Sequence, residues 1–135
     1  MFLNLGILET EIRQYQSRPD LEGREQAHAP DYSFSAGLSW DISNNLELLL
    51  DFNGKSDFYY SDSHDNTSDD YILTNINLIY KKDKINLNFW IRNIFDEYYS
   101  LRGFYFGNEP PAFEDTLYER HGDPRNYGLT FRYEF

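Results

Sequence analysis

The chain contains no cysteine. It therefore has no disulfide framework, no thiolate metal site and no cysteine nucleophile. Basic residues are also scarce: 12 Lys and Arg stand against 23 Asp and Glu, giving a formal net charge of −11. Binding along a nucleic acid needs a basic surface, so nucleic acid is not expected as a partner.

Long apolar runs are missing too. No stretch approaches the roughly 18 residues that a membrane-spanning helix needs. Met1 is followed by Phe-Leu-Asn-Leu-Gly, with neither a basic segment nor a cleavage site, so we expect no signal peptide within these 135 residues.

Residue clusters suited to catalysis or metal binding are equally hard to find. His28, His64 and His121 lie far apart and share no metal-ligand spacing. The acidic stretch 62–70 lacks the glycine turn and closing glutamate of a calcium loop. We therefore expect no catalytic residues, no metal and no cofactor.

The chain is rich in aromatic residues, and its apolar and polar residues alternate regularly. Aromatics make up 19% of it, which a disordered acidic chain would not carry. Apolar and polar side chains alternate with a period of two, which is typical of β-strands. The alternating segments are 32–42, 46–60, 72–80, 85–91 and 127–135, with a weaker one at 2–12.

The apolar phase of the five stronger segments carries no charge. The segments are longer than the usual strands of soluble sheets and suit a tilted membrane strand. We expect this phase to face lipid. Its representative residues are Leu38, Trp40, Leu50, Phe52, Ile76, Leu78 and Phe89.

The connections between segments sort by length. Residues 43–45 and 81–84 are short turns, whereas 13–30, 61–70 and 97–123 are long and polar. Short turns at one rim and long loops at the other are typical of outer-membrane barrels. The sequence therefore predicts an all-β fold, an antiparallel up-and-down transmembrane β-barrel segment of about six strands that forms a partial barrel over residues 1–135.

Aromatic side chains of the apolar phase should gather in two bands at headgroup level. The outer band is predicted to contain Tyr32, Phe34, Phe58, Tyr60 and Tyr127, and the inner band Trp40, Tyr80, Tyr133 and Phe135.

Two C-terminal segments resemble TonB-dependent outer-membrane receptors. Residues 93–99, Asn-Ile-Phe-Asp-Glu-Tyr-Tyr, are similar to the family's N-L-F-D-x-x-Y segment. Residues 122–128, Gly-Asp-Pro-Arg-Asn-Tyr-Gly, are similar to its closing G-x-P-R-x-Y-G strand. The matching positions are Asn93, Phe95, Asp96, Tyr99, Pro124, Arg125 and Gly128. Phe131, Tyr133 and Phe135 resemble the terminal signal that the barrel-assembly machinery reads in this family.

The resemblance implies a bacterial outer-membrane protein that takes part in TonB-dependent uptake of a scarce nutrient, such as an iron–siderophore, cobalamin or a glycan. It implies no enzyme activity. The expected partners are outer-membrane lipid, the barrel-assembly machinery, a small-molecule ligand such as a siderophore, and TonB indirectly through a plug. Family members have a plug and about 22 strands, so we expect this chain to be a fragment, inactive alone, that needs the remainder of the barrel and the plug.

The segment 97–123 is the best candidate for ligand contact. It carries Arg102, Tyr105 and Arg120, and we expect Trp90 and Arg92 to face the lumen below it. Arginine can hold carboxylate or phosphate groups through two parallel hydrogen bonds.

Two other readings fit parts of the sequence. A soluble β-rich ligand-binding module would bury its aromatic residues in a core. An outer-membrane hydrolase would need a constellation such as His28 or His121 with loop acids at the outer rim.

Overall fold

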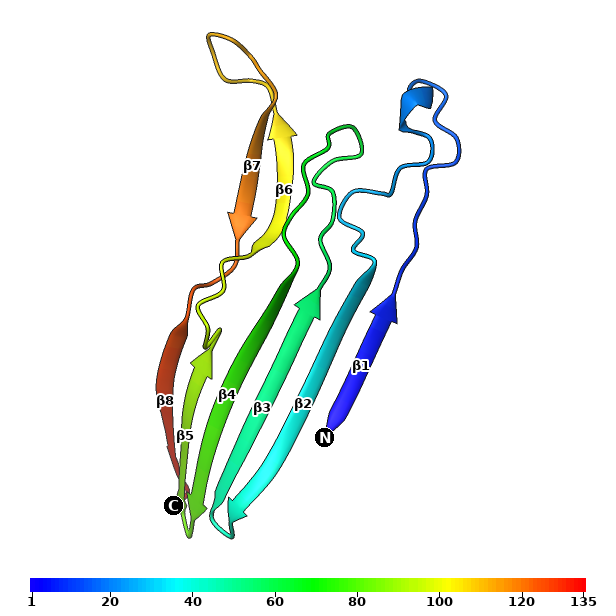
Figure 1. Ribbon diagram of the computed structural model, residues 1–135. Helices are drawn as coiled ribbons and strands as arrows, with labels where there is room; N and C mark the ends of the chain where they lie inside the picture. Colours follow the sequence, from blue (N-terminus) through cyan, green and yellow to red (C-terminus); the bar gives the residue numbers. More distant parts are fainter.

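The computed structural model describes residues 1–135, and its secondary structure is almost entirely β-strand (Figure 1). The strands are β1 (Phe2–Ile7), β2 (Tyr32–Ser43), β3 (Leu46–Lys55), β4 (Tyr71–Lys82), β5 (Ile85–Arg92), β6 (Ser100–Phe106), β7 (Thr116–His121) and β8 (Asn126–Tyr133). The helical content is one 3-10 turn, η1 (Pro19–Leu21). The structure contains no helix of the length and apolarity required to cross a bilayer.

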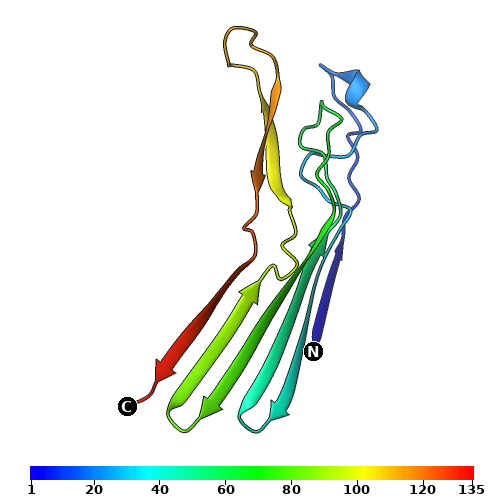
Figure 2. The ribbon, with the colours of Figure 1, turned by 60° about the vertical axis from the view of Figure 1, so that its left-hand side comes forward.

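Six strands form one antiparallel sheet in the order β1-β2-β3-β4-β5-β8. Between β5 and β8 the chain leaves this sheet and makes a separate antiparallel hairpin, β6–β7, beyond its end (Figures 1 and 2). The sheet is not closed, because β1 and β8 lie at opposite edges. The predicted all-β, six-stranded antiparallel architecture is thus confirmed.

Three details differ from the sequence-based expectation. The first strand ends at Ile7 instead of reaching residue 12, and the strand predicted over 46–60 ends at Lys55. Residues 97–123, predicted as a loop, contain the β6–β7 hairpin. Phe58 and Tyr60 were therefore placed wrongly in the outer aromatic band, because both lie beyond β3 and are buried among the loops.

The strand register gathers the apolar phase on one side of the sheet. Directly opposed residues share a face, and alternate residues point to opposite faces. Two rows of partners run across β2, β3, β4, β5 and β8: Leu38, Leu50, Ile76, Ile91 and Tyr127, and then Trp40, Leu48, Leu78, Phe89 and Leu129. We call the side that holds these rows the apolar face.

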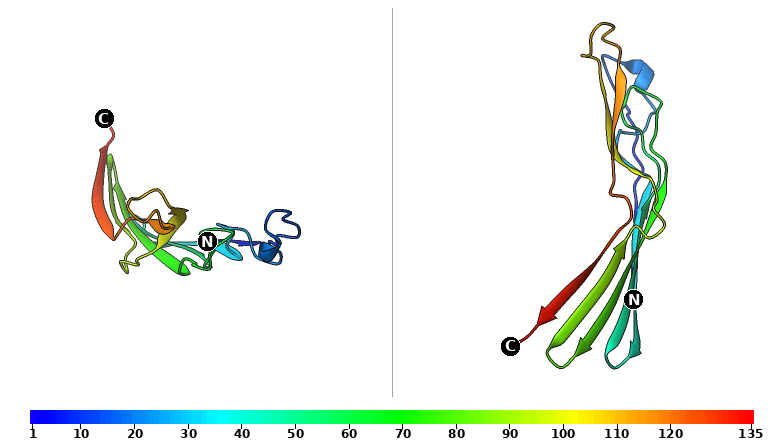
Figure 3. Two further views of the ribbon diagram at one scale, coloured as in Figure 1. Left: turned by 90° about the horizontal axis from the view of Figure 1, so that it is seen from above. Right: turned by 90° about the vertical axis from the view of Figure 1, so that its left-hand side faces the viewer.

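The opposite side, the polar face, carries a different set of side chains. One of its rows contains Asp41, Glu47, Ile79, Asn88 and Thr130. A hollow of about 220 Å³ lies against this face between β4, β5 and β8. Its lining residues all belong to the polar face: Ile79, Lys81, Asn86, Asn88, Thr130 and Arg132. The sheet is curved in the view from above (Figure 3), and the hollow identifies the polar face as its concave side.

No second layer covers the apolar face. The buried hydrophobic residues are Leu21, Phe58 and Tyr60, and all three belong to the connections outside the six-stranded sheet. On the apolar face, by contrast, Trp40 and Phe131 are each 62% exposed. Burying a large apolar side chain stabilises a protein by roughly 1.5–3 kcal/mol. In water this sheet would gain little of that stabilisation.

The two ends of the sheet are built differently. Two-residue turns, 44–45 and 83–84, join β2 to β3 and β4 to β5 at what we call the turn end. The connections 8–31, 56–70 and 93–125, the last including the hairpin, all leave the opposite, loop end (Figures 1 and 2). The predicted sorting of connections by length is therefore present in the structure.

The open edges lead to a first prediction. The outer sides of β1 and β8 present backbone N–H and C=O groups that no other strand pairs, and each such group costs several kcal/mol in hydrocarbon. Six strands also fall below the eight of the smallest known barrels. We expect boiled and unboiled samples of the chain in detergent to migrate alike on electrophoresis. A compact, heat-modifiable monomer would contradict this expectation.

Candidate functional site

The connections at the loop end pack against one another through the segment 56–70. One face of the β6–β7 hairpin contacts this segment. Gly103 lies so close to Tyr60 that a Cβ atom on it would sit 2.6 Å from the Tyr60 Cδ1 atom. Further along the hairpin, the rings of His64 and Tyr105 stack with centroids 3.5 Å apart and an interplanar angle of 8°. These contacts fix the side of the hairpin that we call its docked face.

A polar anchor holds the same contact. The Tyr60 hydroxyl donates to Glu119 Oε1, and the Ser100 hydroxyl donates to the same oxygen over 2.8 Å. Burial, aided by the hydrogen bond to Glu119, raises the pKa of Tyr60 from 10.0 to about 12. The hydrogen bonds from Tyr60 and Ser100 lower the pKa of Glu119. The anchor therefore favours a neutral phenol and a charged carboxylate.

The connection 8–31 packs on the other side of segment 56–70. Arg24 Nη1 lies 2.6 Å from Asp65 Oδ1, and Arg24 Nη2 donates to the His64 carbonyl over 2.6 Å. The His28 backbone N–H donates to the Tyr59 carbonyl over 2.9 Å. Segment 56–70 thus joins all three connections into one cap above the sheet.

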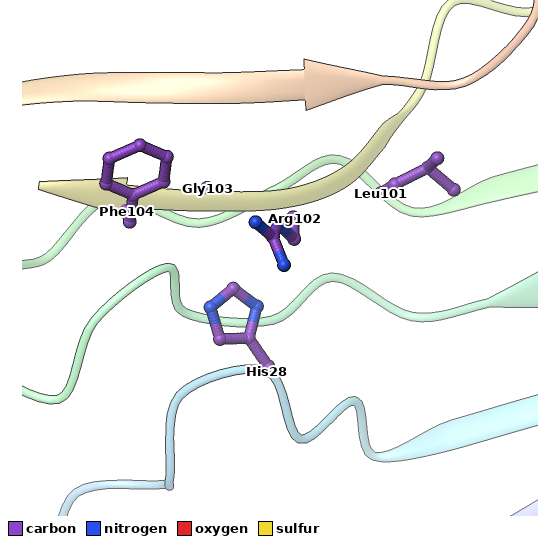
Figure 4. Close-up of a pocket in the computed structure, with 5 residues that line it drawn as sticks. All are labelled: His28, Leu101, Arg102, Gly103 and Phe104. Carbon is purple, nitrogen blue, oxygen red and sulfur yellow. The ribbon is translucent and has the colours of Figure 1, made fainter.

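Within this cap, an open cleft lies between His28 of the connection 8–31 and strand β6 of the hairpin (Figure 4). Its volume is about 520 Å³, and its lining residues are His28, Leu101, Arg102, Gly103 and Phe104. Figure 4 shows the Arg102 side chain directed from β6 toward the His28 ring. The backbone of His28 has a φ of 58°, a left-handed conformation, and its ring lies 5.3 Å from that of Phe58.

The hairpin's second side, its free face, is turned away from segment 56–70. Arg102 opposes Arg120, Phe104 opposes Tyr118 and Phe106 opposes Thr116. These residues alternate with those of the docked face. Seen from above, the hairpin lies on the concave side of the sheet (Figure 3). The free face therefore combines two guanidinium groups with three aromatic rings.

The predicted ligand-facing residues are only partly gathered. Arg102 and Arg120 are opposed in register on the free face, whereas Tyr105 lies on the docked face against His64. Trp90 and Arg92 lie on β5, below the hairpin. Sequence reasoning missed that His28 lines the same cleft as Arg102, because nothing in the pattern relates residues so far apart.

Trp90 occupies the polar face of the sheet directly over a glycine of β8. It pairs with Gly128, where a Cβ would lie 2.4 Å from the Trp90 Cζ2 atom. Gly128 therefore gives the indole room to lie flat along the strand. Arg92 is the last residue of β5, is exposed and pairs with Asn126.

The two C-terminal segments that resemble receptor motifs pack together where β5 ends and β8 begins. Asn93 is 4% exposed and has a φ of 49°. Its side-chain amide donates to the carbonyls of Glu97 and Asp123, and its side-chain oxygen accepts from the Glu97 N–H over 2.8 Å. Asn93 therefore turns the chain out of the sheet and satisfies the backbone groups freed there.

A second tie joins the same segments. Asp96 has a φ of 57°, and its Oδ1 atom accepts from the Arg125 backbone N–H over 2.7 Å. The Arg125 side chain donates to the Ile94 carbonyl over 3.4 Å. Pro124, which has no N–H, stands just before β8, where the ladder has not yet begun.

The remaining motif residues differ in burial. Tyr99 packs so tightly on Gly122 that a Cβ there would lie 1.9 Å from the Tyr99 Cζ atom. Phe95 is 73% exposed. At the C-terminus Phe131, Tyr133 and Phe135 are all exposed, and the Tyr133 and Phe135 rings meet edge-on at 5.3 Å.

One group of residues at the cap superficially resembles a hydrolytic site. Ser100 Oγ lies 3.4 Å from His121 Nδ1 and 2.8 Å from Glu119 Oε1. In a serine triad the acid orients the imidazole, whereas here Glu119 binds the serine hydroxyl and the Tyr60 hydroxyl. The arrangement is explained by docking of the hairpin.

No protein-family model matches the chain. The likeness to TonB-dependent receptors therefore rests on the residues quoted above, and the function is argued below from the geometry.

The anchor leads to a second prediction. Because the pKa of Tyr60 is raised to about 12, its contribution to hairpin docking is present below pH 10 and is lost as the pH rises from about 10 toward 12. We expect the absorbance of phenolate at 295 nm to show a tyrosine that titrates near pH 12. Tyr60→Phe should remove this component and increase hydrogen exchange across residues 100–121.

Tyr15→Phe is the control for this measurement, because Tyr15 is an exposed tyrosine of the connection 8–31. It should leave both the late titration and the exchange unchanged. A late component that persists in the Tyr60→Phe variant would refute the assignment.

Proposed function

We propose that this chain is a segment of an outer-membrane receptor barrel of the TonB-dependent type, which takes part in uptake of a scarce nutrient. Its apolar face contacts lipid, its turn end faces the periplasm and its cap faces the outside. The segment does not act alone: further strands pair with β1 and β8, and a plug links the barrel to TonB.

The observation that carries this proposal is an apolar sheet face with nothing folded over it, whose one charged strand residue, Lys82, lies at the turn end beside Ile85. The rows through Leu38 and Trp40 hold only apolar and aromatic side chains across five strands. Their burial in acyl chains would be favourable by roughly 25 cal/mol per Å². β2 and β4 have 12 residues each, enough for the roughly 9–11 residues of a tilted membrane strand.

The polar face supports the same orientation. It carries Asp41, Glu47, Asp51 and Lys55 along β2 and β3, which lipid would not accommodate. Side chains of this kind suit a water-filled lumen. A soluble β-rich module is less well supported, because it would bury its aromatic residues and this sheet leaves Trp40, Tyr127 and Phe131 exposed.

The two tryptophans provide a direct test of the orientation. Trp40 lies on the apolar face and Trp90 on the polar face. In vesicles of phosphatidylcholine brominated on the acyl chains, we expect the fluorescence of a Trp90→Phe variant, which keeps Trp40, to be quenched several-fold more than that of Trp40→Phe. Equal quenching of both variants in chains with β-sheet circular dichroism would overturn the proposal.

Neighbouring residues of β3 allow a matched test of bilayer insertion. Leu50 lies in the middle of the apolar face, and Asp51 points to the polar face. Arginine on a lipid face near the bilayer midplane costs about 2–4 kcal/mol. In co-sedimentation of the chain with phosphatidylcholine vesicles, we expect Leu50→Arg to weaken the free energy of transfer of the chain into the bilayer by about this amount. Asp51→Arg should change it far less, and a reversed order would place the lipid on the other face.

A further inference from the structure

We propose that the free face of the β6–β7 hairpin, together with His28, binds the phosphate or carboxylate group of a small ligand through Arg102 and Arg120. The site deepens the receptor proposal by giving the chemical class of its ligand. Its role in uptake rests on that proposal, whereas anion binding itself does not.

The first argument is the register of the two arginines. Arg102 and Arg120 are directly opposed in an antiparallel pair, so both side chains project from the same face a few ångströms apart. Like charges in this position repel each other. An anion bound between the two guanidinium groups would attract both of them and offset this repulsion.

The second argument is that neither arginine has a partner. The chain holds 23 acidic residues, yet its ion pairs involve Arg13, Arg18, Arg24, Arg125, Lys81 and His64. Glu119 precedes Arg120 but points to the docked face, where Tyr60 and Ser100 bind it. The carboxylate of Glu109 on this side interacts with the Tyr118 hydroxyl, whose pKa it raises. In a chain of net charge −11, two opposed arginines without an ion-pair partner are unusual.

The third argument is the cleft beside Arg102. Arg102 reaches toward His28 across a space of about 520 Å³ (Figure 4), which lies within the roughly 300–1,000 Å³ of small-molecule sites. An imidazole nitrogen and the guanidinium fork can donate to the same anion. The His28 backbone N–H donates to the Tyr59 carbonyl and the His28 ring lies 5.3 Å from the Phe58 ring, so both parts of His28 contact segment 56–70.

Aromatic side chains complete the surface. Phe104 lines the cleft and stacks on Tyr118, with ring centroids 5.8 Å apart. Leu101 adds a further apolar wall. We therefore infer a ligand that carries a planar or apolar part beside its anionic group.

Inorganic phosphate is the probe for the test, with the full chain held in phosphate-free dodecyl maltoside micelles. We expect calorimetry to show saturable binding that Arg102→Gln and Arg120→Gln each weaken at least tenfold. Arg102→Lys and Arg120→Lys keep the charge and should restore part of the affinity. Arg13→Gln removes one exposed positive charge elsewhere in the loops and should have little effect.

The results separate the alternatives. Absence of saturable binding, or equal weakening by all three glutamine variants, would overturn the site. A second experiment compares binding of the chain to vesicles with and without phosphatidic acid. If binding depends on both Arg102 and phosphatidic acid while free phosphate does not bind, the surface recognises a lipid headgroup. That outcome would refute the small-ligand proposal. The tryptophan-quenching experiment does not depend on phosphate or phosphatidic acid binding. It therefore tests the receptor proposal separately from the anion site.

Discussion

The stability of the six-stranded sheet depends on what covers its apolar face, because no element of the chain packs against it. A soluble sheet is stabilised by a second layer that buries one of its sides, and here no element of the chain performs that role. The three buried hydrophobic residues all lie in the connections. The sheet can therefore gain hydrophobic stabilisation only from a surrounding apolar medium or partner. Because the strand register places the apolar side chains on one face, that medium or partner must contact the same face of every strand.

The backbone groups that are freed where a strand of this sheet ends also need hydrogen-bond partners. At the end of β5, Asn93 and Asp96 adopt left-handed conformations and bind backbone groups of the segments 93–97 and 123–125. The chain can then leave the ladder without orphaned N–H and C=O groups. Asn93 and Asp96, two polar residues of the segments that resemble receptor motifs, thus have a structural role at the rim of the sheet.

Alternation predicted the six-stranded sheet well, because a period of two follows directly from strand geometry. It failed at Phe58 and Tyr60, which continue the apolar phase of β3 but are buried by loop contacts after the strand has ended. Alternation also fails to predict the β6–β7 hairpin, because Gly103 and two arginines interrupt any apolar pattern there. The approach of His28 to Arg102 depends on how three connections pack, which local sequence does not encode.

The hairpin uses its two faces for different purposes. Its docked face is tied to segment 56–70 by Gly103, by Glu119 and by the stacked Tyr105, so its position above the sheet is fixed. Its free face leaves Arg102 and Arg120 without an ion-pair partner. Because the contacts that hold the hairpin in place lie on its docked face, substitutions on its free face need not displace it.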